Sequence, residues 1–159
     1  MRPTTDFAKE GLFNYLTNRI DIENQTVIDL FAGTGNMSFE FISRGASPVY
    51  AVDMNHKCVH YMIKVSVKLG FENYKVLRRD ALKFLKKCVI TADIIFMDPP
   101  YDANTYPNLI KTVLERNLLN SGGLLIVEHD KNNNFEEVPL FKESKSYGNV
   151  IFSVFEQPD

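Results

Sequence analysis

The sequence contains little cysteine and no apolar run long enough to cross a membrane. A membrane-spanning helix needs roughly 18 to 20 consecutive apolar residues, and no segment of the 159-residue chain approaches that length. Residues 1–10 also lack the apolar centre of a secretory signal. The two cysteines, Cys58 and Cys88, lie far apart and outside any CxxC or Cys/His cluster. We therefore expect a soluble, cytoplasmic protein with reduced cysteines, no metal site and no membrane partner.

Strong charge, internal repeats and flexible linkers are also absent. The net charge of −2 and the pI near 5.9 provide no global basic field, so any contact with nucleic acid must come from a local patch. No repeat, low-complexity tract or Pro/Gly/Ser-rich linker divides the chain. The composition is that of a globular protein, with 45% hydrophobic and 12% aromatic residues, which argues against disorder. We predict a single domain over residues 1–159, with a monomer as the default state.

Short apolar runs alternate with segments of helical spacing along most of the chain. The apolar runs cover residues 26–31, 48–52, 74–77, 92–97 and 124–127. The helical segments follow them, around residues 37–43, 59–70, 81–85 and 109–118. Continuous apolar runs are typical of strands that are buried on both faces of a parallel sheet. The alternation therefore predicts an open α/β fold.

The two ends of the chain depart from this alternation. Residues 141–146 alternate with charges, residues 147–149 supply a turn, and residues 150–155 form another apolar run. This pattern predicts a closing antiparallel hairpin. At the other end, residues 6–16 place apolar side chains on one helical face, and Thr5 is a candidate N-cap. We expect this N-terminal helix to pack on the sheet.

Acidic residues occupy the ends of four of the predicted parallel strands. They are Asp29, Asp53, Asp80 and Asp98. Open α/β sheets bind ligands at the carboxyl ends of their parallel strands. We therefore predict that these four side chains line one rim of the sheet.

The turn after the first strand contains Gly33 and Gly35, where the backbone can bend sharply and approach a ligand closely. A dinucleotide site requires a third glycine, but Ser38 stands in that place, and the lysine of a phosphate-binding loop is absent. Asp29 would repel a pyrophosphate and suits a ligand that carries ammonium and sulfonium charges. S-adenosylmethionine is such a ligand, and a tight turn without a ligand is the alternative.

Two further acidic residues fit parts of such a ligand less specifically. Asp53 follows Gly35 by 18 residues, a spacing at which an acidic residue accepts hydrogen bonds from ribose hydroxyls, although NAD sites use the same device. Asp80, which precedes Ala81, could accept the adenine amino group or cap the next helix. Both interpretations of Asp80 stay open.

The segment from Ile94 to Tyr101, IIFMDPPY, ends the fourth apolar run. Its two prolines stop the strand and remove backbone N–H donors, which leaves the Asp98 carboxylate and nearby carbonyls as acceptors. Such acceptors would orient an exocyclic amino group and stabilise the positive charge that develops on its nitrogen. Tyr101 would offer a flat face for a base. A plain strand-ending turn is the alternative.

The pair formed by DLFAGTG at residues 29–35 and DPPY at residues 98–101 resembles the class I S-adenosylmethionine-dependent methyltransferases of amino nitrogens. Adding RPTTD at residues 2–6, KEGLFN at residues 9–14 and SRGA at residues 43–46 makes the chain similar to the bacterial 16S ribosomal RNA guanine-N2 methyltransferase family. This resemblance covers most of the chain. It implies a Rossmann-like α/β fold with a mostly parallel seven-stranded sheet, an antiparallel last strand and helices on both faces.

The resemblance also implies the activity and its residues. The reaction would transfer a methyl group from S-adenosyl-L-methionine to the N2 amino group of a guanine in 16S rRNA of the small ribosomal subunit. The catalytic residues would be Asp98, Pro99, Pro100 and Tyr101. The cofactor-binding residues would be Asp29, Phe31, Gly33, Thr34, Gly35, Asp53, Met54, Asp80 and Ala81. The substrate-binding residues would be Arg2, Thr4, Thr5 and Tyr101.

Two departures from the family pattern concern RNA binding. Family members commonly carry a basic stretch ahead of the Arg-Pro-Thr motif, whereas this sequence begins at Met1, as a truncated start would explain. Many members also have an arginine where this chain has Phe7. The remaining basic candidates are interpreted first as solvated helix faces; they are Arg44, Lys57, Arg78, Arg79, Lys83, Lys86 and Lys87.

The three histidines are not assigned a catalytic role. His56 and His60 share a helical face without a third ligand, and His129 is expected to be an ordinary surface residue. Residues 132–134 are expected to form a loop. The alternative functions are methylation of adenine N6 in DNA or RNA, methylation of a protein glutamine, and a non-catalytic cofactor- or RNA-binding module. A nicotinamide-dependent oxidoreductase is a further alternative, but it leaves DPPY unexplained.

Overall fold

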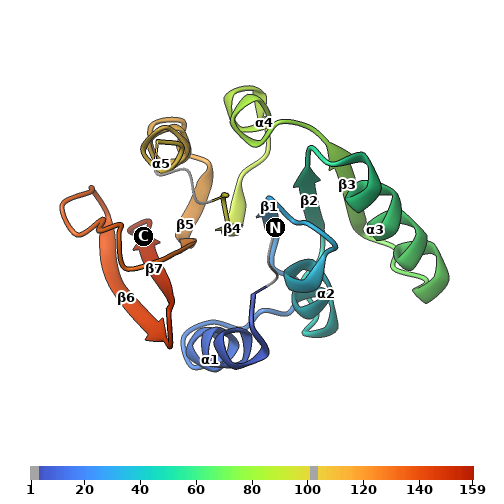
Figure 1. Cartoon of the computed structure of the whole chain (residues 1–159), viewed down its shortest axis with the longest axis horizontal. Helices are drawn as coiled ribbons and strands as arrows, with labels where there is room; N and C mark the ends of the chain where they lie inside the picture. Colours follow the sequence, from blue (N-terminus) through green and yellow to red (C-terminus); the bar gives the residue numbers. More distant parts are fainter. Residues whose placement is uncertain (1–3, 101–103) are drawn as a thin grey trace.

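The computed structural model describes residues 4–100 and 104–159. Within these residues, seven strands form one sheet in the order β3-β2-β1-β4-β5-β7-β6 (Figure 1). The strands are β1 Val27–Leu30, β2 Val49–Asp53, β3 Tyr74–Arg78, β4 Ala92–Met97, β5 Leu119–His129, β6 Phe141–Tyr147 and β7 Val150–Glu156. Strands β1 to β5 run parallel to one another, and β7 runs antiparallel to both β5 and β6. The predicted sheet and its closing hairpin are confirmed.

Helices cover both faces of the sheet, as predicted (Figure 1). They are α1 Asp6–Thr17, α2 Asn36–Ser43, α3 His56–Leu69, α4 Ala81–Lys87 and α5 Tyr106–Glu115. The apolar residues of α1 and α2 share one core cluster, and those of α4 and α5 share another. Met62 of α3 packs against Ala51 of β2 and Phe39 of α2, so α3 lies on the same face as α2. Among the described residues, no helix is both long and apolar enough to cross a membrane.

The fifth helix and the strand after it differ from their predicted bounds. The α5 helix begins at Tyr106 rather than Leu109, because Pro107 lies in its first turn, where a missing N–H donor is tolerated. It ends before Leu118, which the sequence had placed in the helix. Strand β5 is longer than predicted, because Leu119 pairs with Ala92 through an irregular register before the regular pairing begins.

Alternation along β1 decides which side chains reach the two faces. Val27 packs with the α1 and α2 cluster, whereas Ile28 and Leu30 pack with the α4 and α5 cluster. Because successive side chains of a strand point to opposite faces, Asp29 shares the face of Val27. The same alternation brings Phe96 of β4 to that face. A carboxylate therefore lies under α2 within an otherwise apolar strand.

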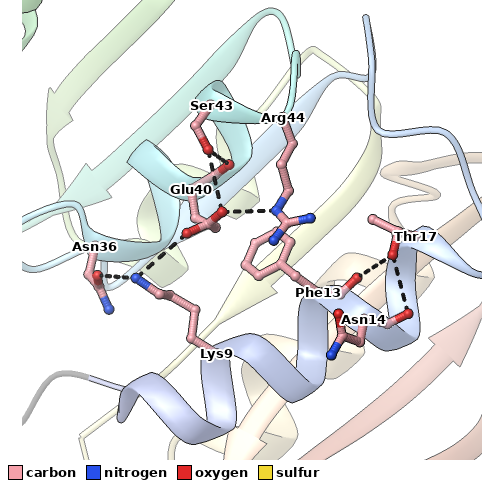
Figure 2. Close-up of polar contacts among 8 residues, drawn as sticks. All are labelled: Lys9, Phe13, Asn14, Thr17, Asn36, Glu40, Ser43 and Arg44. Atoms are coloured by element: carbon pink, nitrogen blue, oxygen red, sulfur yellow. Dashed lines mark hydrogen bonds and ion pairs between the residues drawn. The ribbon is translucent and has the colours of Figure 1, made fainter.

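Polar contacts fix α1 against α2 (Figure 2). Lys9 donates to Asn36 Oδ1 at 3.1 Å and lies 3.7 Å from Glu40 Oε1. Glu40 also pairs with Arg44 at 2.9 Å, and the Arg44 guanidinium lies 4.8 Å from the centre of the Phe13 ring. These contacts hold the start of α1 beside the start of α2, next to the carboxyl ends of the parallel strands.

Candidate active site

A cavity of about 350 Å³ opens at the carboxyl ends of β1, β2 and β4, and we call it the strand-end cavity. Its volume is within the usual range of small-molecule sites. It is lined by Thr4, Asp29, Phe31, Ala32, Gly33, Thr34, Asn36, Met37, Asp53, Asn55, Cys58, Phe96 and Asp98. Three of the four predicted rim carboxylates, Asp29, Asp53 and Asp98, are therefore brought together.

The loop between β1 and α2 has an unusual backbone. Phe31, Gly33 and Gly35 all have positive φ, at 59°, 60° and 91°. A Cβ atom at Gly35 would lie 3.0 Å from Met62 Cγ and from the Phe39 ring. Only glycine fits that close approach without displacing its neighbours. The loop therefore turns back over the cavity, with Phe31, Gly33 and Thr34 in its lining.

Asp29 is buried, with 1% of its surface exposed. The Ser38 hydroxyl donates to Asp29 Oδ2 at 2.6 Å. Burial raises the pKa of Asp29 to about 7, although hydrogen bonds from the side chain and backbone of Ser38 act in the opposite direction. Nearby Asp53 and Glu128 add to the rise. A cation bound in the cavity would favour the ionised form of this carboxyl group.

Asp53 holds the ends of two loops together. Its Oδ2 atom accepts a hydrogen bond from the Gly33 backbone N–H at 2.8 Å, and its Oδ1 atom accepts one from the Asn55 backbone N–H, also at 2.8 Å. Only 6% of the residue is exposed. Burial and the Asp53 carboxylate together raise the pKa of the neighbouring Cys58 thiol. Asp53 thus shapes the cavity as well as lining it.

The N-terminal segment forms one wall of the cavity through Thr4. The Thr4 hydroxyl donates to Glu128 Oε1 at 2.6 Å in a buried contact, and Asn36 Nδ2 lies 3.5 Å from the Thr4 carbonyl. Thr5 does not line the cavity; its hydroxyl caps α1 by accepting from the Ala8 N–H at 3.2 Å. The predicted cap is confirmed, and Thr4 is the residue that reaches the site.

Asp98 follows β4 directly and lines the cavity. Of the two prolines after it, Pro99 is buried and Pro100 is exposed, and neither is among the lining residues. The predicted Tyr101 and Arg2 lie outside the described residues. The parallel register between β1 and β4 places Leu30 opposite Met97. Asp98, which follows Met97, and the glycine loop, which follows Leu30, therefore lie at the same rim of the sheet.

Four predicted cofactor-binding residues do not line the cavity, namely Gly35 of the glycine loop, Asp80, Ala81 and Met54. Asp80 caps α4 by accepting from the Lys83 N–H at 3.0 Å and does not line the cavity, so the helix-cap interpretation is confirmed. Ala81 is buried in the core cluster beside α4. The Met54 side chain is 58% exposed. Its carbonyl accepts from Arg78 Nε at 3.1 Å.

Several residues at the site were not predicted from the sequence. Asn36, Met37 and Cys58 come from the first turns of α2 and α3, and Phe96 comes from β4. Helix starts after parallel strands lie at the ligand-binding edge, so the positions of Asn36 and Asn55 beside the glycine loop and Asp53 were an available signal. No sequence pattern pointed to Glu128, because it lies 124 positions along the chain from its partner Thr4.

His129 is buried rather than on the surface, with 6% of its surface exposed, so the sequence expectation was wrong. Strand β5 continues to this residue and pairs it with Ile151. Its Nε2 atom lies 2.6 Å from Ser153 Oγ, and its Nδ1 atom lies 2.7 Å from the Asp130 carbonyl. Burial lowers the pKa of His129. The described residues contain no cluster of three or more His, Cys, Asp or Glu side chains suited to a metal.

The strand-end cavity suits a positively charged ligand with a sugar. Its described lining contains three carboxylates and no lysine or arginine, which disfavours a pyrophosphate. The open backbone at Gly33 permits close approach of a ligand. A buried carboxylate with a raised pKa gains most from a ligand that brings a positive charge. These residues fit the ammonium and sulfonium groups of S-adenosylmethionine.

Comparison with known proteins gives consistent matches over the whole chain. The family described as Conserved hypothetical protein 95 matches residues 1–156. Ribosomal RNA small subunit methyltransferase D of Haemophilus influenzae is 31% identical, with 98% of this chain and 83% of that protein covered. The protein of the same name from Escherichia coli K12 is 29% identical, with 99% and 80% covered.

Solved structures agree with this match. A putative methyltransferase from Escherichia coli superposes with a TM-score of 0.88 at 26% identity, covering 99% of this chain and 90% of that one. A Thermus thermophilus 16S rRNA N2 methyltransferase, solved with AdoMet and guanosine, has a TM-score of 0.77 at 18% identity, covering 97% of this chain and 44% of that one. The second likeness concerns the fold alone.

Proposed function

The chain belongs to the Conserved hypothetical protein 95 family, and from this membership we propose that it methylates the N2 amino group of a guanine in 16S rRNA. It is an S-adenosyl-L-methionine-dependent methyltransferase of the ribosomal RNA small subunit methyltransferase D type. The observation that carries the proposal is the meeting of Asp29, Asp53 and Asp98 in one cavity beside the glycine loop.

In this proposal the chain binds the cofactor through residues of β1 and β2. S-adenosyl-L-methionine, when bound, supplies a methyl group on a positively charged sulfur. Asp29 accepts hydrogen bonds from the cofactor's ammonium group and balances its charge. Asp53 accepts from the ribose hydroxyls, while Gly33 and Gly35 keep the loop backbone close to the methionine part. Thr4 closes the cavity from the N-terminal side.

The same rim presents the target nitrogen. The guanine amino nitrogen is a weak nucleophile, because its lone pair is delocalised into the ring. Asp98, together with nearby carbonyls, accepts hydrogen bonds from the amino hydrogens and turns the lone pair towards the methyl group. The same contacts stabilise the positive charge that develops on nitrogen. The nitrogen–carbon bond forms as the methyl–sulfur bond breaks, and the sulfur keeps the electron pair as a neutral thioether. The methylated nitrogen then gives its proton to water, and no strong base is required because that nitrogen is already acidic.

Product analysis tests the proposal. The protein is incubated with isotopically labelled S-adenosylmethionine and small ribosomal subunits that lack the modification, and the digested RNA is examined by mass spectrometry. We expect label in N2-methylguanosine. Label in N6-methyladenosine would move the acceptor to adenine, and no label despite calorimetric binding of the cofactor would contradict the enzyme proposal.

The assembly state and the location are part of the proposal. A monomer is expected, and light scattering after size-exclusion chromatography checks it. We propose a cytoplasmic location because ribosomal RNA is the substrate.

A further inference from the structure

Basic residues are concentrated in one stretch of the chain. Residues 54–90 hold nine of the 18 lysines and arginines but only two of the 20 acidic residues, Glu72 and Asp80. Their formal net charge is +7, whereas the rest of the chain carries −9. The overall net charge of −2 conceals this separation. We call residues 54–90 the basic edge.

The fold gathers this stretch at one side of the molecule. It consists of α3, β3 and α4, and β3 is the terminal strand of the sheet on the side opposite β6 (Figure 1). Lys57, Lys64 and Lys68 are exposed along α3, and Lys75 is exposed on β3. The cations therefore come from both faces and from the free edge of the sheet.

In the part of the chain that the structure describes, the cations of the basic edge form no ion pair with an acidic residue. The described residues contain six ion pairs, and all six use cations from outside residues 54–90. Arg78 Nε and Arg79 Nη1 donate only to backbone carbonyls, those of Met54 and Arg78. Elsewhere on the surface, six lysines and arginines are each paired with a glutamate. On the basic edge the charge of the cations is available to an external anion.

A groove of about 450 Å³ lies at the centre of the basic edge, between α4 and the sheet. Three cations line it, Arg79, Lys83 and Lys87, together with two aromatic residues, Tyr50 and Phe84. Lys83 and Lys87 are one helical turn apart, so they lie on the same side of α4. Cations beside aromatic rings are the combination that holds a nucleic-acid strand by its phosphates and bases.

The groove begins next to the strand-end cavity. The Arg79 backbone N–H donates to the Asp53 carbonyl at 3.2 Å, and Asp53 lies opposite Arg78 in the sheet register. Strand β3 is three strands away from β4, about 14 Å at roughly 4.8 Å per strand. This distance is short enough for one RNA molecule to contact the groove while its target base lies at Asp98.

We propose that the basic edge, with this groove as its centre, binds the sugar-phosphate backbone of the RNA substrate. The proposal rests on the proposed function for the identity of the RNA. Arg79, Lys83 and Lys87 contact phosphates, and α3 extends the contact through Lys64 and Lys68. Such contacts position the RNA without reading its sequence.

The test compares two double variants with the same change in charge. Lys83→Gln/Lys87→Gln removes two cations from the groove, and Lys111→Gln/Lys131→Gln removes two exposed cations outside the basic edge. Binding of unmodified 16S rRNA is measured by filter binding from 50 to 300 mM KCl. Cofactor affinity by calorimetry and thermal unfolding show whether each variant is folded.

We expect the groove variant to weaken RNA binding by about tenfold at 100 mM KCl. It should also reduce the slope of log Kd against log salt by about 1.4 to 1.8, because each lost phosphate contact removes roughly 0.7 to 0.9. The control should leave the slope within about 0.3 of wild type, and cofactor affinity should stay unchanged in both variants. In the transfer assay, KM for RNA should rise while kcat is kept.

Two results separate this proposal from the proposed function. If wild type methylates 16S rRNA and both variants bind RNA equally well, the basic edge is not the RNA surface while the enzyme activity stands. If wild type transfers no methyl group but the groove variant alone loses salt-dependent binding, the RNA surface stands and the enzyme activity does not. If both variants lost RNA affinity equally, the groove would not be the binding surface, because the loss would reflect net charge only.

Discussion

The strand-end cavity and the basic edge meet at the end of β2, yet they offer opposite charges to their ligands. The cavity holds Asp29, Asp53 and Asp98 and no described lysine or arginine. The basic edge exposes nine cations and contains only two acidic residues. One region suits a small cation that is largely enclosed, and the other suits a long polyanion that stays in water.

The two regions also differ in how their charges are held. Asp29 and Asp53 are buried and fixed by hydrogen bonds of 2.6 to 2.8 Å. The lysines of the basic edge are exposed and surrounded by solvent. Salt screens exposed charges over about 8 Å at physiological ionic strength but screens buried ones much less. The two ligands should therefore respond differently to salt, pH and substitution.

Asp98→Ala should have the largest effect and should act on the reaction alone. We expect turnover to fall by at least about 10³-fold, at the upper end of losses from removing one transition-state contact, while cofactor affinity changes by less than about threefold. Single-turnover methyl transfer and calorimetry measure the two quantities. Glu137→Ala, which removes an exposed carboxylate that does not line the cavity, is the matched control. Full turnover in Asp98→Ala would contradict its role in orienting the amino group.

Asp29→Asn should act on the cofactor and leave RNA binding intact. We expect cofactor affinity at pH 8 to fall roughly 10- to 100-fold, because a hydrogen bond to a charged group contributes about 1.5 to 3 kcal/mol. RNA affinity in the filter assay should match wild type. Calorimetry with unchanged cofactor affinity would show that Asp29 does not hold the ammonium group.

Salt should separate the two regions in the unmodified protein. The three groove contacts alone should weaken RNA binding by about 20- to 40-fold when KCl is raised from 50 to 200 mM, since each contributes roughly 0.7 to 0.9 to the salt slope. Cofactor affinity over the same range should change by less than about twofold. Parallel filter-binding and calorimetric titrations check this. An equal salt dependence for both ligands would remove the distinction between the regions.

The smallest expected effect is on stability, and it arises from the raised pKa of Asp29. Folding raises this pKa from 3.8 to about 7, so the folded state binds the proton more tightly than the unfolded state. The resulting stabilisation is present below about pH 4 and is lost as the pH rises to about 7. Without cofactor, Asp29→Asn should therefore be more stable than wild type at pH 8, by about 1 to 3 kcal/mol.

Thermal unfolding between pH 5 and pH 8 measures this difference. A gain of 1 kcal/mol corresponds to roughly 2 to 4 °C for a chain of this size. The advantage of Asp29→Asn should shrink as the pH falls towards 5, because wild type then becomes protonated at the same position. Asp21→Asn, which changes an exposed carboxyl group, should show no such trend. If the stability difference between Asp29→Asn and wild type were the same at all pH values, titration of Asp29 would be excluded as its cause.

Much of the fold was predictable because it depends on local patterns. Six apolar runs located six of the strands, and the alternation with charges at residues 141–146 located the seventh. The glycine and acidic residues at the strand ends located the ligand-binding edge. Thr5 and Asp80 were recognisable as helix caps, because a cap depends on residues only three positions away. Element ends were less accurate, as α5 and β5 show, because Leu118 and Leu119 suit a helix or a strand equally well.

The candidate site was only partly predictable for the same reason. Asp29, Asp53 and Asp98 were found from their place at strand ends. Asp80 was grouped with them, but it caps α4 and is not among the residues that line the cavity. The contact between Thr4 and Glu128 and the burial of His129 depend on the pairing of distant strands. No local pattern contains that information.

The sequence by itself determined the alternation of strands and helices, the glycine loop, the acidic strand ends and the excess of cations in residues 54–90. These properties depend on residue type and on spacing within a few turns. The tertiary structure alone decided which carboxylates share a cavity, that Thr4 reaches Glu128, and that α3, β3 and α4 form one basic side. Strand order and register bring those residues together, and they are set by packing across the whole sheet.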